Sequence, residues 1–414
     1  MQHQDSTAKA QDVAVTAPTI DMFIADGNRL TRAETSGPPE ITLSPPDGKW
    51  GPQTHVTAEK FVARFDSMGQ ISRIHGDAHA RVVTTEAPRN NIPEPERVST
   101  SDGIDGYFRP GTGIETLLQT GHFAYQAGTQ QAFADRARYT PSDQILVLNG
   151  APRILDSGMA TTARSIKLNR ATGDGFAEGG VKTTYSDLKT QPDGALLASS
   201  DPIHVTAESM TAHNSPSTAI YKGNARLWQD ANMVEAPTIQ FQKDQRIIVA
   251  DSDSQQKVST ALTSADRGGK STPVHITSNH LVYHDSEREA NYQGDVLARS
   301  PDMTLNSSQM EVFFARASPS AEKSVAAGTP AKLEKIIASG AVVVTQPTRH
   351  ATGDKLTYTS EDDRFILTGG PPSIFDAERG KITGVSLTLF RRDDRVIVDG
   401  SSSLPAVTNT RVVR

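Results

Sequence analysis

The chain has 414 residues, of which only 36% are hydrophobic and 6% aromatic, and its formal net charge at pH 7 is -6. This hydrophobic fraction is low for a large compact globular protein. It favours an extended structure with a thin core, in which each segment contacts only its neighbours along the chain. The charge is spread without a basic stripe, which argues against nucleic-acid binding. The chain contains no cysteine, so disulfides, thiolate metal sites and cysteine nucleophiles are excluded.

The amino terminus shows no export signal. Met1–Ala10 is polar and lacks the apolar segment of a signal peptide. No apolar run in the chain reaches the roughly 18 residues that a membrane span needs. A removed leader, a cytoplasmic protein and a misplaced gene start all stay open. We expect residues 1–12 to form a disordered terminus.

A repeat runs through the rest of the chain. A small residue is followed three places later by an apolar residue, and thirteen places after that by a glycine or serine. Thirteen further places lead to the next copy, a period of about 29 residues that is typical of repeat architectures. Six copies keep the 13-residue gap, which is too regular for chance. The eleven copies, some of them expanded, are Ala17-Ile20-Gly37, Ala58-Phe61-Gly76, Ser101-Ile104-Gly121, Ala134-Ala137-Gly150, Ala163-Ile166 with Gly179 or Gly180, Ala207-Met210-Gly223, Ala236-Ile239-Ser252, Ser278-Leu281-Gly294, Ser307-Met310-Gly340, Gly353-Leu356-Gly369 and Gly384-Leu387-Gly400.

Three insertions interrupt this repeat, at residues 86–99, 262–272 and 318–332. The second is rich in glycine and serine, and we place a domain division there. Residues 13–262 would form one β-roll with a divergent early part, and residues 273–414 a second, either separate or continuous with the first. Helical signal is nearly absent; the one modest candidate, Ser320–Ala327, lies inside the third insertion.

Each repeat reads as two strands. Around Gly223, alternate residues from Ala219 to Leu227 are apolar or small, whereas Lys222, Asn224 and Arg226 are polar. This period of two is that of a half-buried strand. Turn-forming residues separate the strands, so neighbours should pair as antiparallel hairpins. The turns are expected at 214–217, 230–232, 243–245, 285–287 and 361–363.

The repeated glycine falls inside its strand, where glycine weakens a strand unless the backbone bends or bulges. The small and apolar residues of each copy are three places apart, so a regular strand cannot turn both inward. A bend between them resolves this conflict. We therefore predict an all-β fold in which a meander of bent strands forms two facing sheets, in an elongated antiparallel roll of about eleven two-strand units.

Several segments resemble the OstA-like repeats of the lipopolysaccharide-transport proteins LptA and LptC and of the amino-terminal part of LptD. These segments are Tyr221–Leu227, Tyr292–Val296 and Ala338–Val342, with the preceding strands Val205–Met210 and Ile276–Tyr283, which are similar to the family pattern V-x-A-x-x-L-x-Y. The resemblance is clearest from about residue 200 to the end. The chain departs from the family in its length and in lacking a visible export signal or anchor.

The resemblance implies a β-jellyroll or β-taco fold in the periplasm, with lipid A acyl chains bound in the groove and no cofactor or catalytic residue. It implies as partners lipopolysaccharide or lipid A and other OstA-like proteins, LptC-like or LptD-like, stacked edge to edge, with a head-to-tail homo-oligomer as a further form. It leads us to expect a non-catalytic bridge module that shields acyl chains on the way to the outer membrane.

Inward-facing positions are the candidates for lining such a groove. They are Met210, Tyr221, Leu227, Ile239, Phe241, Leu281, Tyr283, Val296, Leu356, Tyr358 and Leu387. The same residues could instead pack against one another as a dry core, which would suit a structural or adhesive β-repeat protein without a ligand. Arg391, Arg392 and Arg395 could meet an anionic headgroup at the rim, or lie in a solvated turn.

Other sites are weaker. His280 with His284, and His75 with His79, have helical metal-pair spacing, but in a strand each pair lies about 13 Å apart. Gly269-Lys270-Ser271 lacks the first glycine and the context of a phosphate loop. Glu361-Asp362-Asp363 falls at a turn, and we find no Ser-His-Asp triad and no carboxylate pair that would favour a β-helix glycosidase.

Overall fold

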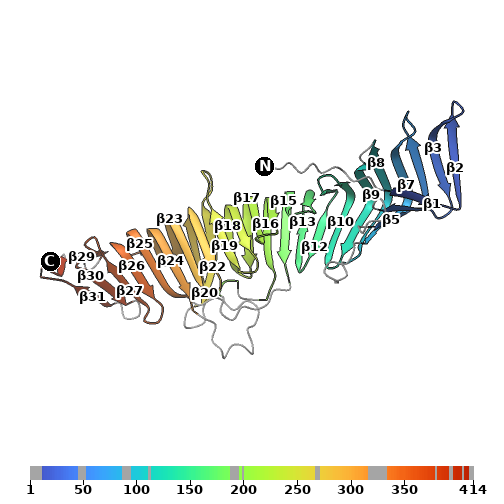
Figure 1. Cartoon of the computed structure of the whole chain (residues 1–414). Helices are drawn as coiled ribbons and strands as arrows, with labels where there is room; N and C mark the ends of the chain where they lie inside the picture. The colour runs from blue at the N-terminus through green and yellow to red at the C-terminus, as the bar shows by residue number, and fades with distance from the viewer. Residues whose placement is uncertain are drawn as a thin grey trace, which may run out of the picture. The chain divides into compact units, whose positions relative to one another are not determined.

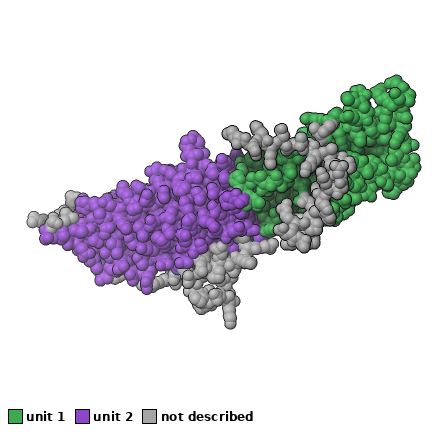
Figure 2. All heavy atoms as spheres, viewed as in Figure 1, with its two compact units in different colours: residues 1–183, 209–214 green, residues 184–208, 215–414 purple. Residues whose placement is uncertain are grey.

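The computed structural model describes residues 12–44, 53–85, 95–110, 113–186, 195–197, 200–265, 271–315, 333–377, 380–390, 395–402 and 405–409. These residues form 32 strands and connecting turns (Figure 1). No helix in the described part is long and apolar enough to cross a membrane. The chain divides into two compact units: unit 1 is residues 1–183 with 209–214, and unit 2 is residues 184–208 with 215–414 (Figure 2).

Unit 1 contains the first fourteen strands and shares the next two with unit 2. The strands are β1 (Asp12–Thr16), β2 (Thr19–Ala25), β3 (Arg29–Ser36), β4 (Glu40–Ser44), β5 (Gln53–Thr57), β6 (Lys60–Phe65), β7 (Ile71–Thr85), β8 (Arg97–Arg109), β9 (Gly113–Ala127), β10 (Gln130–Thr140), β11 (Ile145–Asn149), β12 (Arg153–Asp156), β13 (Met159–Thr162), β14 (Ser165–Asn169), β15 (Gly175–Tyr185) and β16 (Ile203–His213).

Unit 2 contains the remaining strands, which lie side by side in Figure 1. They are β17 (Thr218–Gln229), β18 (Asn232–Gln242), β19 (Ile247–Asp251), β20 (Val258–Ala265), β21 (Ser271–Ser278), β22 (His280–His284), β23 (Glu289–Ser300), β24 (Met303–Phe314), β25 (Leu333–Thr345), β26 (Arg349–Thr359), β27 (Arg364–Thr368), β28 (Ser373–Asp376), β29 (Gly380–Thr383), β30 (Ser386–Phe390), β31 (Arg395–Asp399) and β32 (Val407–Asn409).

The pairing within each unit is antiparallel and follows chain order, and a long strand often pairs with two short ones. The second part of β26 pairs with β27, whereas its first part pairs with β28. In the same way β23 pairs with β22 along its first part and with β21 along its second. Each long strand therefore takes part in two sheets that meet near its middle. The predicted antiparallel roll of bent strands is confirmed.

The bend lies at the repeated glycine. In β23 the register with β24 shifts between Gln293 and Val296, and the two intervening residues, Gly294 and Asp295, have φ angles of 76° and 47°. The backbone amide of Asn279 donates to the carbonyl oxygens of Gln293 and Gly294 at 3.1 and 2.9 Å. The predicted bulge is therefore present, and it holds the two halves of the strand at the corner.

The other anomaly, the three-residue spacing, is resolved at the corresponding corner of the partner strand. In β18 both Ala236 and Ile239 are completely buried, although three residues separate them. Their neighbours alternate normally on either side, with Val234 and Phe241 buried. The change of phase at this corner lets both halves of the strand turn their apolar side chains inward, as expected.

Alanine at a corner glycine is expected to destabilise unit 1 more than alanine at a turn glycine. At Gly150, φ is +81° and an added Cβ would lie 2.5 Å from Cβ of Asp135. The left-handed conformation costs a non-glycine residue about 1–2 kcal/mol, and overpacking adds about 1–3 kcal/mol. Gly150→Ala should therefore lower the free energy of unfolding by about 2–5 kcal/mol, measured by urea denaturation.

Gly69 provides the matched control, because its φ is +76° and an added Cβ would meet nothing within 4 Å. Gly69→Ala should cost only the conformational part, about 1–2 kcal/mol. Equal losses for the two variants would show that the packed corner contributes nothing.

Several predictions fall outside the described residues. They include the helix candidate Ser320–Ala327, the loop Gly268–Lys270 and nearly all of the terminal segment 1–12. The domain division at 262–273 stays a prediction; it falls within unit 2, where β20 and β21 pair from Val258–Ser278 to Ala265–Ser271.

Candidate functional site

The inner faces of unit 2 carry continuous apolar rows that run across the strands. One row follows the register from strand to strand, and each side chain in it lies next to the following one. Its members are Tyr221, Ile239, Ala250, Leu281, Tyr292, Met310, Ala338, Leu356, Leu367 and Leu387. All of them are buried. Because cross-strand neighbours are the units of sheet stabilisation, this row forms one unbroken apolar surface.

A second row lies on the other half of the bent strands. Its members are Leu227, Val234, Thr260, Ile276, Ala298, Leu305, Val344, Ala351 and Ile374. It is apolar apart from Thr260, which is 1% exposed. The two rows belong to the two halves of the same bent strands, so their side chains share the interior of unit 2.

Ten of the eleven predicted lining residues are buried, and nine of those lie in unit 2. Met210 is the buried residue of unit 1, where the Thr183 hydroxyl lies 3.6 Å from its sulfur. Tyr358 is only half-buried. Its hydroxyl donates to Asp363 at 3.1 Å, and its ring packs on Phe365 with centroids 4.7 Å apart. That the eleven predicted residues hold a lipid stays a prediction.

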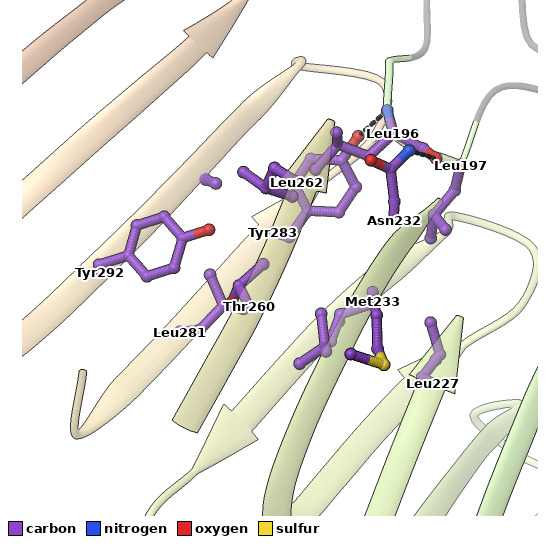
Figure 3. Close-up of a pocket in the computed structure, with 13 residues that line it drawn as sticks. Leu196, Leu197, Leu227, Asn232, Met233, Thr260, Leu262, Leu281, Tyr283 and Tyr292 are labelled. Carbon is purple, nitrogen blue, oxygen red and sulfur yellow. Dashed lines mark hydrogen bonds between the residues drawn. The ribbon is translucent and has the colours of Figure 1, made fainter. Parts of the chain in front are cut away.

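The interior of unit 2 is hollowed in one region beneath β18, β20 and β22 (Figure 3). This first hollow encloses about 330 Å³ of empty space, which includes open solvent at its mouth. Three predicted residues, Leu227, Leu281 and Tyr283, line it. The remaining lining residues are Leu196, Leu197, Asn232, Met233, Val234, Ile248, Thr260, Leu262, Ala290 and Tyr292.

A second hollow, of about 460 Å³ including its mouth, lies between β24 and β30. The predicted residues Leu356 and Leu387 line it together with Phe365 and Ile374. Arg349 contributes a cationic group to the same wall. Its Nε donates to Asp376 on the neighbouring strand at 2.8 Å.

Around β15, β17 and β18 the interior is closely packed. Tyr185 meets Phe241 edge-on with ring centroids 5.1 Å apart, and the hydroxyls of Tyr185 and Tyr221 are 2.7 Å apart. Burial raises the pKa of Tyr185 well above its ordinary value. Ile239 is fully buried next to Tyr221. The predicted residues Tyr221, Ile239 and Phe241 therefore form packed core, while Leu227, Leu281, Tyr283, Leu356 and Leu387 border the hollows.

A buried polar cluster at the first hollow was missed from the sequence. Asp285 is completely buried and Arg246 is 3% exposed, although both lie in turns. The hydroxyl of Tyr283 donates to Asp285, and burial raises the pKa of this tyrosine. Burial lowers the pKa of Arg246, while Asp285 opposes that shift. The sequence predicts turns at 243–245 and 285–287, and no periodic signal marks Arg246 or Asp285 as buried.

Unit 1 has a similar inner row, but a polar residue interrupts it. The row passes from Ile104 through Gln119 to Ala137. Gln119 is 4% exposed; its amide nitrogen donates to Ser101 at 3.1 Å, and its oxygen accepts from Ser99 at 2.9 Å. Buried polar groups need such partners. Gln119 is therefore a hydrogen-bonded polar residue that interrupts an otherwise apolar row.

The alternative sites find ordinary structural roles in the described residues. His280 and His284 contact the carboxylates of Asp251 and Glu287 at 2.7 and 3.0 Å. The described residues contain no group of three or more ligands that could hold a metal ion. The segment 361–363 is a turn, as predicted. Among the rim arginines, Arg391 and Arg392 lie outside the described residues, and Arg395 lies over the ring of Phe390 at 4.4 Å.

The fold and the hollows define a class of protein: an antiparallel β-roll with a continuous apolar interior. Residues 275–395, under a third of the chain, match the family model described as "LptA/(LptD N-terminal domain) LPS transport protein". This segment, which contains β22 to β30, is similar to the OstA-like lipopolysaccharide-transport family. The resemblance identified in the sequence is confirmed there.

One similar solved structure is that of LptH from Pseudomonas aeruginosa, described as the LptA homologous periplasmic component of the conserved lipopolysaccharide transport device. The sequences are 14% identical, and the match covers 36% of this chain and 99% of that chain with a TM-score of 0.27. No curated protein sequence matches the chain.

Proposed function

We propose that the chain is a non-catalytic carrier module that shields the acyl chains of lipopolysaccharide in the apolar interior of unit 2. The observation that carries this proposal is the unbroken apolar row from Tyr221 to Leu387, which borders both hollows. The family model supports it, because that model describes lipopolysaccharide-transport proteins and covers the part of the row from β22 to β30.

The physical basis is the hydrophobic effect. Each methylene group removed from water contributes about 0.8 kcal/mol. Ten methylene groups would therefore contribute roughly 8 kcal/mol before the costs of ordering the lipid and the side chains. A row with similar side chains at successive strands offers similar wells at successive positions. Such a surface favours movement of the acyl chain along the row over tight retention at one place.

The proposed setting is the periplasm, with other OstA-like proteins as partners. Exposed strand edges can pair with a strand of another chain. β2 pairs with β3 and carries the exposed apolar residues Met22 and Ile24, which are 63% and 62% exposed. These side chains would be covered by an added β-strand of the same fold. Such an edge contact between unlike edges would also allow head-to-tail assembly of copies of this chain.

Photocrosslinking provides the test. A photoreactive amino acid placed at Tyr283 or Leu387, which border the two hollows and are each 1% exposed, should form covalent adducts with lipopolysaccharide in cell envelopes. The control is Phe375, which lies in the same unit and is 53% exposed. Adducts from the interior positions and none from Phe375 would support the proposal. Adducts from Phe375 alone, or from no position, would contradict it.

A structural or adhesive role with a filled core is the second candidate, and the close packing around Tyr185 and Phe241 favours it. The two candidates differ in whether the hollows admit an acyl chain. A spin-labelled fatty acid should be immobilised by the purified protein if the interior carries lipid. It should stay freely mobile in solution if the core is sealed.

A further inference from the structure

A short segment of the chain forms part of the wall of the first hollow. The connection between β15 and β16 runs from 186 to 202, and its described part Ala195–Leu197 is here called the strap. Leu197 is 2% exposed, and the side chains of Leu196 and Leu197 form part of the wall of the hollow (Figure 3). The strap thus places two leucines against the same apolar surface that we propose for an acyl chain.

The strap is held mainly through its backbone. The amides of Ala195 and Leu197 both donate to Oδ1 of Asp285 at 3.0 Å. The amide of Leu196 donates to the hydroxyl of Tyr283 at 2.7 Å. All three successive amides of the strap therefore meet buried acceptors on the β22 side of the hollow.

The strap carbonyl groups are held from the opposite side. Nδ2 of Asn232 donates to the carbonyl oxygen of Leu196 at 3.2 Å (Figure 3), and Arg246 donates to that of Leu197. Asn232 begins β18, and Arg246 lies in the turn that follows the same strand. Side chains from two regions of the unit thus bind the backbone of the three strap residues. These four side chains, here called the receptor, are Tyr283, Asp285, Asn232 and Arg246.

These contacts do not fully satisfy the buried carboxylate of Asp285. Oδ2 of Asp285 makes no hydrogen bond within the described residues, although the residue is completely buried. A buried acceptor without a donor is unfavourable, and this reduces the net advantage of the closed strap over an open one in which water reaches Asp285. The contacts therefore hold a segment whose two leucines line the hollow, at the cost of one buried acceptor without a donor.

We infer that the strap is an internal competitor for the acyl site, in which Leu196 and Leu197 occupy the mouth of the hollow until an acyl chain displaces them. This inference rests on the proposed function. Entry of lipid would require the backbone bonds to Asp285 and Tyr283 to open. The receptor would thereby keep an empty carrier from exposing its apolar interior.

The test uses a thiol on the strap, which is specific because the chain has no cysteine of its own. In the full-length Leu197→Cys protein, a thiol reagent should react slowly at this buried position. Adding Asp285→Asn weakens the acceptor of two strap amides and should raise the labelling rate about tenfold, as expected for weakened charge-assisted hydrogen bonds. It should also speed the binding of a pyrene-labelled dodecanoic acid.

Asp253→Asn is the matched control. Asp253 accepts backbone amides from Gln255 and Gln256, each at 2.8 Å, in an exposed turn of the same unit. This variant should change neither rate. In the Leu197→Cys protein, unlabelled dodecanoic acid should increase thiol labelling, because the acyl chain displaces the strap.

Protection of the thiol by dodecanoic acid would overturn the inference, because the strap would then close over the ligand. An unchanged labelling rate in Asp285→Asn would overturn it as well. If the wild-type protein binds the pyrene probe and Asp285→Asn binds it no faster, the strap inference fails while the carrier function stands. If no variant binds the probe although Asp285→Asn speeds labelling, the carrier function itself fails.

Discussion

Replacing Ala290 with tryptophan is expected to lower the affinity of the protein for a fluorescent acyl probe at least about tenfold. Ala290 is 1% exposed, lines the first hollow and lies between Tyr283 and Val312 in the sheet register. An indole at this position would fill the space that we propose for the acyl chain. The affinity can be measured by titrating the pyrene-labelled dodecanoic acid with each protein variant.

Stability must be measured alongside, because inserting a large side chain into a packed interior costs about 1–3 kcal/mol. The control is Gln293→Trp, since Gln293 is exposed on the same strand. This variant should bind the probe like the wild-type protein. Wild-type affinity in a folded Ala290→Trp protein would exclude the first hollow as an acyl site.

Replacing Arg349 with methionine is expected to lower the free energy of unfolding by about 3 kcal/mol. The side chains of Arg349 and Asp376 are 17% and 10% exposed, and they bond at 2.8 Å across β26 and β28. Removing the cation leaves a buried carboxylate whose desolvation is no longer compensated by this partner. Urea denaturation monitored by circular dichroism gives the loss directly.

Two further variants separate the buried pair from ordinary surface electrostatics. Lys257→Met removes an ion pair whose side chains are 47% and 79% exposed, and such pairs contribute about 0–1 kcal/mol. The double variant Arg349→Met with Asp376→Leu should recover most of the loss, because no buried charge then lacks its partner. A loss in the double variant as large as in Arg349→Met alone would contradict this account.

The bend of the strands could be predicted because it leaves a local trace in the sequence. A glycine at an interior strand position, as at Gly294, has a physical use only if the backbone changes direction there, and its φ of 76° shows that it does. The phase change between Ala236 and Ile239 is equally local. Both signals repeat, so the fold followed from the sequence along most of the roll.

The polar receptor could not be predicted in the same way. Asp285 and Arg246 lie in two separate turns, and turn residues of these types are ordinarily solvated. Their burial depends on the strap, whose residues are about 90 positions before Asp285 and follow no repeat. Whether a position such as Leu227 borders a hollow or packed core likewise depends on the volumes of several non-local side chains.

The register of unit 2 also bears on how such a chain can change length during evolution. Each strand pairs only with strands near it in the chain, as β23 pairs with β21, β22 and β24. Duplication or deletion of one whole hairpin pair therefore leaves every remaining partner in place, whereas loss of a single strand reverses the direction of its successor. Genes for such proteins are expected to grow and shrink in steps of one complete period.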